Sequence, residues 1–290
     1  MSRTPERPAA PGRAPSSRGN DADAAYAVGG FRDRQQELER LRVQARAFLA
    51  EERPILERLG LPDEGRFLDV GCGPGFVAEA LGEALPGLEV FGVDLDRTVL
   101  PRRGRFAAAQ AGRLPLDQGR FAAAYARLVL RHVPDPGLVV GEMARVLAPG
   151  GRALLADTDD GGLVLSPMPP GFPEVLAARH AGFRRRGADP EVGRRLPGLL
   201  QAAGLDDIRI EVLPVHSGRL GPAAFGAIVL APIADAVDPD LLAPDRVLEV
   251  ARELEGWAAQ PGAFGALTVV LASGRRPDGP LEVAAPRTDA

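Results

Sequence analysis

A glycine-rich turn at residues 71–75 constrains this chain more than any other feature. It follows an apolar segment at 66–70 and reads Gly-Cys-Gly-Pro-Gly. Glycine adopts positive φ and lets the backbone approach a ligand closely, and the first turn of the helix predicted at 76–85 offers free N–H groups. The pattern predicts a strand, a turn and a helix that bind a cofactor, with a purely structural turn as the alternative.

An acidic residue at the end of the next predicted strand supports the cofactor interpretation. Residues 88–94 form this strand and end at Asp94, where such folds place an acid that hydrogen-bonds ribose hydroxyls. The alternative is a solvated loop aspartate. A nicotinamide fingerprint needs a third glycine at position 76, where this chain has Phe76. A nicotinamide oxidoreductase is therefore the weaker interpretation.

Strands and helices alternate along most of the chain. Strands are predicted at 66–70, 88–94, 106–110, 121–126, 152–157, 208–215 and 266–272. Helices are predicted at 76–85, 137–147, 174–186, 191–203 and about 245–258. This alternation indicates an α/β fold with a doubly wound, mostly parallel sheet, in which ligands bind at the carboxyl ends of the strands.

The flanking segments suggest one domain between two tails. We expect a disordered tail at 1–24, a domain at 25–277 and a C-terminal tail at 278–290. Amphipathic helices, broken near Pro54, are expected between 31 and 59. A proline-rich stretch with two helices, at about 160–204, is predicted to be an inserted cover.

Composition excludes several kinds of chemistry. All 35 basic residues are arginine, and both a Walker phosphate loop and a pyridoxal Schiff base need lysine. The single cysteine, Cys72, cannot by itself form a disulfide or a structural zinc site.

Charge and hydropathy bear on partners and location. A net charge of -4 argues against nucleic acid as a partner. No apolar run is long enough to span a membrane, and the first residues lack a secretory core. We expect a cytoplasmic protein without a membrane partner. The oligomeric state cannot be predicted.

Five motifs in order give the chain a family resemblance over about residues 26–277. They are Leu-Asp-Val-Gly-Cys-Gly-Pro-Gly at 68–75, Gly-Val-Asp at 92–94, Leu-Pro-Leu at 114–116, Leu-Arg-His-Val-Pro-Asp-Pro at 130–136 and Glu-Met-Ala-Arg-Val-Leu-Ala-Pro-Gly-Gly at 142–151. The sequence resembles the class I S-adenosylmethionine-dependent methyltransferases, particularly the small-molecule branch of quinone and sterol methyltransferases. The resemblance implies a seven-stranded Rossmann-like sheet with an N-terminal helical lid that includes Tyr26 and Gln44.

The resemblance also implies S-adenosylmethionine as the cofactor and a set of binding residues. The turn would line its methionine part, Asp94 its ribose and Leu95 its adenine. Gln110 stands where the family often has aspartate, and its carbonyl oxygen still accepts a hydrogen bond. The full set is Asp69, Gly71, Cys72, Gly73, Gly75, Asp94, Leu95, Gln110, Ala111 and Arg127.

The implied reaction is methyl transfer to oxygen, nitrogen or carbon of a small-molecule acceptor, of the kind found in secondary metabolism. Residues 126–129 read Ala-Arg-Leu-Val, which is not the motif of enzymes that methylate nucleic-acid amines. A relative that binds the cofactor for other chemistry, as a cyclase, decarboxylase or sensor, would carry the same motifs.

Candidate side chains for acid–base chemistry are few. His132 could accept a proton from the acceptor, or could be a helix-start histidine satisfied by backbone. His180 is expected to face solvent. No metal site is predicted, because the aspartates at 157, 159 and 160 are interpreted as an acidic loop. A solvated face is predicted for the arginines at 184–186, 194 and 195.

Overall fold

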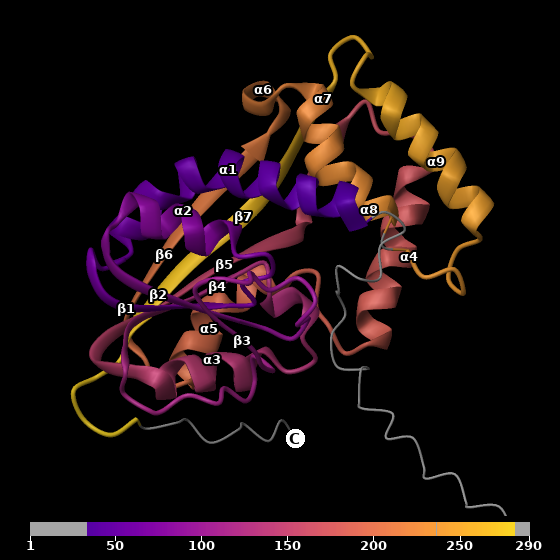
Figure 1. The fold of residues 1–290 in the computed structure, drawn as a ribbon. Helices are drawn as coiled ribbons and strands as arrows, with labels where there is room; N and C mark the ends of the chain where they lie inside the picture. The colour runs from indigo at the N-terminus through magenta and orange to yellow at the C-terminus, as the bar shows by residue number, and fades with distance from the viewer. Residues whose placement is uncertain (1–33, 236, 282–290) are drawn as a thin grey trace, which may run out of the picture.

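The molecule is built on one twisted sheet that runs through its middle (Figure 1). The computed structural model describes residues 34–235 and 237–281. Its seven strands have the order β3-β2-β1-β4-β5-β7-β6. They are β1 (Glu64–Val70), β2 (Gly87–Asp94), β3 (Arg105–Ala108), β4 (Phe121–Arg127), β5 (Leu147–Ser166), β6 (Asp206–His216) and β7 (Phe264–Arg275).

The sheet is parallel except for one strand. β1 to β5 pair in parallel, and β7 runs antiparallel to both β5 and β6. Its central strands read as continuous apolar sequence, as expected where both faces are covered; Ala123, Ala124 and Tyr125 of β4 are fully buried. The predicted doubly wound fold is confirmed. The strand order reverses between β1 and β4, which places a binding crevice at their carboxyl ends.

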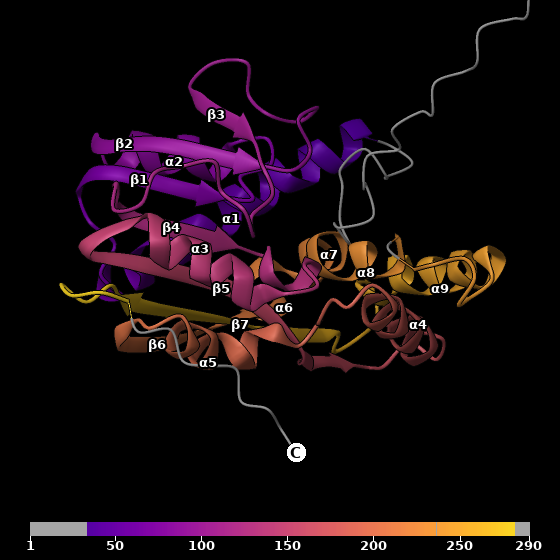
Figure 2. The same cartoon turned by 90° about the horizontal axis from the view of Figure 1, so that it is seen from below.

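Helices cover both faces of the sheet (Figure 2). One face carries α1 (Arg34–Arg58) and α2 (Phe76–Ala84), and the other carries α3 (Pro136–Val146) and α5 (Leu196–Ala202). Leu56 and Leu81 belong to the core on the first face, and Val140 and Leu200 to the core on the second. Each helix thus buries one apolar stripe against the sheet.

The expected break near Pro54 is wrong, because α1 continues through this residue as one helix of 25 residues. Proline removes one helical hydrogen bond. Tertiary packing outweighs this loss here, since Ile55, Leu56 and Leu59 of the last turn are buried in the core.

The helical cover is built differently from the prediction. Only α4 (Phe172–Arg185) of the two helices predicted for it lies there, beside α8 (Ala231–Asp235) and α9 (Pro244–Trp257). The other helix, α5, packs on β6, β7 and α3, so its inclusion in the cover was wrong. Its buried side chains Leu196 and Leu200 explain this position. Short 3-10 segments, η3 (Leu130–His132) and η4 (Val192–Arg195), precede α3 and α5.

The rest of the cover comes from the chain between β6 and β7. Its helical segments are α6 (Ser217–Leu220), α7 (Pro222–Phe225), the π-helical η5 (Gly226–Leu230), α8 (Ala231–Asp235) and α9 (Pro244–Trp257). Trp257 of α9 is fully buried, and its indole N–H donates to the carbonyl of Pro167. The cover therefore joins two segments that are distant in sequence.

Two predictions lie outside the described residues. The tail predicted at 1–24 and the lid residue Tyr26 precede residue 34, and most of the C-terminal tail follows residue 281. Across 34–235 and 237–281, no helix has the length and apolar character needed to cross a membrane.

Candidate functional site

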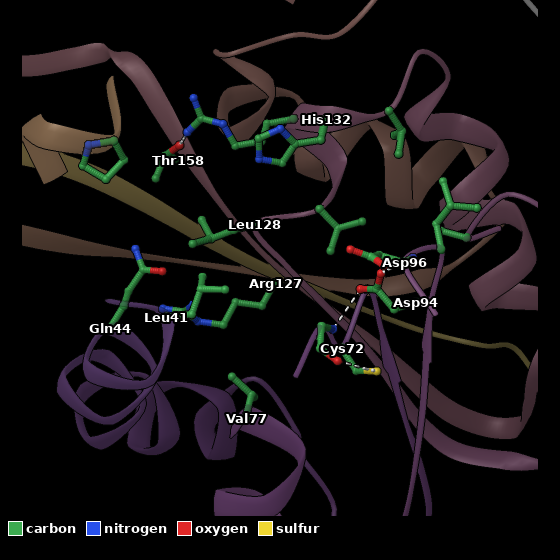
Figure 3. A pocket seen from close by; sticks show the side chains of 18 of the residues that line it. Leu41, Gln44, Cys72, Val77, Asp94, Asp96, Arg127, Leu128, His132 and Thr158 are labelled. Atoms are coloured by element: carbon green, nitrogen blue, oxygen red, sulfur yellow. Dashed lines mark hydrogen bonds between the residues drawn. The ribbon is translucent and has the colours of Figure 1, made fainter. Parts of the chain in front are cut away.

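A cavity of about 530 Å³ lies at the carboxyl ends of β1, β2 and β4. The residues that line it come from α1, the glycine-rich turn, the loops after β2, β3 and β4, and the cover. Figure 3 shows Cys72 and Asp94 at one end, His132 and Thr158 at the far side, and Leu128 between them. The cavity thus connects the predicted cofactor turn with the cover.

The turn has the backbone geometry that its glycines predicted. Gly71 has φ 74°, and a Cβ there would lie 2.4 Å from a methyl of Val129. Gly75, the residue before α2, has φ 80°, and a Cβ would lie 2.6 Å from Pro101. The N–H groups of Gly71 and Cys72 both donate to the carbonyl of Val93, at 2.7 and 2.9 Å. The turn is therefore held against the end of β2.

Asp94 is oriented by two backbone hydrogen bonds. Its Oδ2 accepts from the N–H of Gly73 and its Oδ1 from the N–H of Asp96, both at 2.8 Å. Each carboxylate oxygen has a further lone pair, and Asp94 lines the cavity. The side chain is therefore preset to accept hydrogen bonds from two neighbouring hydroxyls of a ligand.

Asp69 brings a buried carboxyl group to the same end. Its side chain is 2% exposed, and Oδ2 has no hydrogen-bond partner among the described residues. Burial, followed by repulsion from Asp94, raises the pKa of Asp69 to about 7. A positively charged ligand group would compensate this carboxylate. The cavity thus combines a site for a diol with a site for a cation.

The predicted adenine residues flank this end of the cavity. Leu95, Gln110 and Ala111 all line it, and Leu95 is 44% exposed, which leaves its side chain available to a ligand. Of the predicted cofactor residues, Gly75 alone is not among those that line the cavity, and its role is to start α2. Gln44 of α1 lines it as the lid prediction required.

Arg127 ends β4 in a buried network that sequence reasoning missed. Its Nε and Nη2 donate to the two carboxylate oxygens of Glu52 at 2.7 and 3.0 Å, and the hydroxyl of Tyr125 donates to Glu52 at 3.2 Å. Arg127 follows the buried residues of β4, and a buried arginine requires a carboxylate partner. No local pattern, however, points to Glu52 on α1.

Leu128, the next residue, has an unusual backbone. Its φ of 56° lies in the left-handed region, which branched side chains rarely adopt. Its N–H donates to the carbonyl of Ala156 at 2.8 Å, and the side chain lines the middle of the cavity (Figure 3). Such strain often accompanies a functional site. Here it occurs between the end of the cavity at the glycine-rich turn and the end at the cover.

His132 lies on the cover side of the cavity, at the end of η3. Its backbone N–H donates to the carbonyl of Val129 at 2.9 Å, as any residue at this position would. Burial and the nearby charge of Arg131 hold the pKa of the imidazole well below its usual value. The ring is therefore neutral at neutral pH, and its centre lies 5.6 Å from that of Phe183.

Asp159 and Asp160 lie within β5 and are ion-paired to arginines. Both oxygens of Asp160 accept from Nη2 of Arg131, at 3.0 and 2.9 Å, and Asp159 accepts two bonds from Arg194 at 2.7 Å. In the part of the chain that the structure describes, no group of three metal-ligating side chains occurs. The predicted acidic loop is therefore wrong, because these aspartates are buried within β5 and belong to a network of charges.

Two predictions for exposed side chains are wrong. The imidazole of His180 is 18% exposed and lies 3.4 Å from Asp160 rather than in solvent. Arg186, predicted on a solvated face, lines the cavity. Both follow from the packing of α4 near Asp160 of β5, which the helical pattern alone does not reveal.

Apolar residues of the cover complete the far wall. Ile228, Val229 and Ile233 line it and belong to the core on the α1 side of the sheet. Sequence reasoning missed them, because their segment shows no helical periodicity that separates a cavity wall from an ordinary core.

The chain matches known proteins over the segment that carries the turn. Residues 68–155 match the family described as "Methyltransferase domain". A ubiquinone/menaquinone biosynthesis C-methyltransferase of Desulfotalea psychrophila is 33% identical over 112 residues, which are 36% of this chain and 46% of that protein. Methyltransferase GfsG of Streptomyces halstedii is 32% identical over 190 residues, 60% of this chain and 64% of that protein.

Solved structures share the fold. The [4+2]-cyclase SpnF is 22% identical with a TM-score of 0.51, covering 79% of this chain and 82% of that one. A methyltransferase of Thermotoga maritima, described as a possible histamine N-methyltransferase, is 18% identical with a TM-score of 0.51, covering 83% and 96%. The chain spans about half to two thirds of the length of the two curated relatives. The family match and the relatives confirm the predicted resemblance to methyltransferases, and the solved structures confirm the fold.

Proposed function

We propose that this chain, which has the fold and the motif order of the class I S-adenosylmethionine-dependent methyltransferases, methylates a small-molecule acceptor. The observation that carries the proposal is the single cavity that joins the turn, Asp69 and Asp94 to the cover. A cofactor bound at one end would present its reactive group toward a molecule at the other.

The residues at the turn fit the chemistry of this cofactor. Asp94 is oriented to accept from both ribose hydroxyls, and the buried carboxyl of Asp69 suits the positive charge of the methionine part. Leu95 and Gln110 line the same end of the cavity, and adenine would contact the exposed apolar surface of Leu95. When bound, S-adenosylmethionine supplies an electrophilic methyl group on a positively charged sulfur.

The cover supports a small acceptor. The cavity of about 530 Å³ is within the range of roughly 300–1,000 Å³ that small-molecule sites occupy. Apolar side chains of η5 and α8 wall its far side, where they would shield a bound acceptor from water and hold it in place. Much of the rate of methyl transfer can come from such positioning. A role in secondary metabolism stays a prediction.

His132 is the candidate proton acceptor for a hydroxyl acceptor. It lines the cavity and is neutral at neutral pH, because its pKa is held low. A neutral imidazole has one nitrogen lone pair that can accept a proton. The low pKa makes it a weak base in the unliganded protein, so a negative charge bound nearby would strengthen it.

Calorimetry and product analysis test the proposal. The protein should bind S-adenosylmethionine and S-adenosylhomocysteine and show no comparable affinity for NAD, since Phe76 replaces the third glycine. S-adenosylhomocysteine should accumulate when a panel of small hydroxyl, amine and carbon acceptors is supplied. Absence of cofactor binding contradicts the proposal.

Binding without accumulation of S-adenosylhomocysteine would favour the alternative, a protein that uses the cofactor site for other chemistry. The fold is compatible with it, since SpnF, whose structure is similar, is described as a [4+2]-cyclase.

A further inference from the structure

Three arginines line the cover side of the cavity and are here called the arginine cluster: Arg131 of η3 and Arg179 and Arg186 of α4 and its C-terminal end. Their guanidinium carbons lie 5.3, 4.9 and 5.6 Å from the centre of the Phe183 ring. Arg131 and Arg179 are 5% and 8% exposed. One aromatic ring thus collects three cations beside the cavity.

Two carboxylates only partly balance this charge. Both carboxylate oxygens of Asp160 accept hydrogen bonds from Arg131, and Oδ2 lies 3.7 Å from Nε of Arg179. Asp157 accepts from the backbone N–H of Arg131 at 3.1 Å. Asp238 pairs with Arg185 rather than with Arg186, and among the described residues Nε of Arg186 has no hydrogen-bond partner. The cluster therefore retains an excess of one positive charge.

The cluster also retains unused hydrogen-bond donors. Nε of each of the three arginines is buried and has no hydrogen-bond partner within 34–235 and 237–281. Burial, followed by repulsion from Arg131, lowers the pKa of Arg179 to about 10. Buried cations and donors of this kind are stabilised by an anion with several acceptor oxygens.

The surroundings of the cluster are apolar. Ile228, Val229 and Ile233 form the neighbouring wall of the same cavity, and Arg179 is tied to this wall because its Nη1 donates to the carbonyl of Pro232 at 3.3 Å. A ligand that fills this half of the cavity would therefore meet an apolar wall and a basic one.

We propose that the acceptor carries one anionic group, a carboxylate or a phosphate, which the arginine cluster binds while the apolar part contacts Ile228, Val229 and Ile233. The inference rests on the proposed function, whose cofactor site is at the other end of the cavity. Arg186 is the residue that determines this specificity, because Arg131 and Arg179 already share Asp160. Bidentate recognition of carboxylate and phosphate is the usual role of arginine.

The test uses the full chain saturated with S-adenosylhomocysteine and three probes of equal chain length: octanoate, octyl phosphate and octan-1-ol. Calorimetry should show that at least one anion binds roughly tenfold or more tightly than the alcohol. Preference for one of the two anions then identifies the group. Equal binding of all three probes, or no binding of either anion in the millimolar range, overturns the inference.

Variants locate the effect. Arg186→Met should abolish the preference for the anion, and Arg186→Lys should restore part of it by keeping the charge. The matched control is Arg195→Met, since Arg195 is 54% exposed and pairs with Asp189 at 2.8 Å. An unchanged preference in Arg186→Met overturns the inference. If the wild-type protein does not bind S-adenosylhomocysteine at all, the proposed function itself is wrong.

Discussion

Glu52 on α1 and Arg127 at the end of β4 form a buried, two-bonded ion pair although 75 residues separate them. The two side chains are 1% and 8% exposed, and the hydroxyl of Tyr125 donates to the same carboxylate. This pair joins α1, from which Leu41 and Gln44 line the cavity, to the end of β4, where Arg127 lines it.

Replacing Glu52 with Ala should destabilise the protein strongly. The substitution leaves the buried guanidinium of Arg127 without its carboxylate, a change that typically costs about 3–5 kcal/mol. Urea denaturation followed by circular dichroism measures the loss. Glu39→Ala on the same helix is the control, because Glu39 and Arg42 are exposed and 3.7 Å apart, so its effect should stay below about 1 kcal/mol. Equal losses of unfolding free energy in both variants would show that the Glu52–Arg127 pair does not stabilise the protein.

Replacing Asp94 with Asn should weaken cofactor binding. Asparagine keeps one acceptor oxygen but loses the charge that strengthens both hydrogen bonds to the ribose, and bonds to charged groups contribute about 1.5–3 kcal/mol each. We expect the Kd for S-adenosylhomocysteine to rise roughly 10- to 100-fold. Asp117→Asn is the control, since the side chain of Asp117 is 81% exposed. An unchanged Kd in Asp94→Asn would mean that Asp94 does not hold the ribose.

Cofactor affinity should depend on pH through Asp69. Its pKa is raised to about 7 by burial and by Asp94, so the carboxyl is neutral below this pH and negative above it. Only the negative form attracts a cation, and the affinity should therefore rise up to about tenfold per pH unit below 7 and level off above. Calorimetry between pH 5.5 and about 8.5 measures the slope. Asp69→Asn should bind weakly with little pH dependence.

The same raised pKa predicts the opposite trend for the stability of the unliganded protein. Because the folded state keeps the proton that the unfolded state releases near pH 3.8, the contribution of Asp69 to stability falls as pH rises from about 4 to 7. Asp69→Asn removes the buried charge and should raise the melting temperature at pH 8. A lower melting temperature would show that the carboxylate stabilises the fold.

His132 offers a test of acid–base chemistry. If it accepts a proton from a hydroxyl acceptor, His132→Gln should lower kcat by roughly 10²- to 10⁴-fold while the Kd for S-adenosylhomocysteine stays unchanged. Since its pKa is held well below the ordinary value of 6.5, kcat should show no His132 titration above that pH. A nearly unchanged kcat in the variant would assign His132 the structural role alone.

The features that were predicted correctly from the sequence are those that depend on residues close together in the chain. Apolar strands, glycines with positive φ and an acid at a strand end are set by short-range sterics and hydrogen bonding, so β1, the turn, α2 and β2 follow from residues close in sequence. The same reasoning failed at Pro54, where burial of Ile55 and Leu56 kept α1 continuous.

Long-range packing decided the rest. The helical pattern of α5 is the same whether it covers a ligand or a sheet, and only its contacts with β6 and β7 distinguish the two. The exposure of His180 and Arg186 likewise depended on where α4 packs, which is beside Asp160 of β5 and the cavity.

The sequence by itself determined the individual strands, the glycine-rich turn and the acid at its side, because each depends on neighbouring residues. Only the tertiary structure decided that Glu52 pairs with Arg127 and that three arginines surround Phe183 beside the cavity. The physical reason is that a buried charge takes its partner from whichever segment the fold brings within reach.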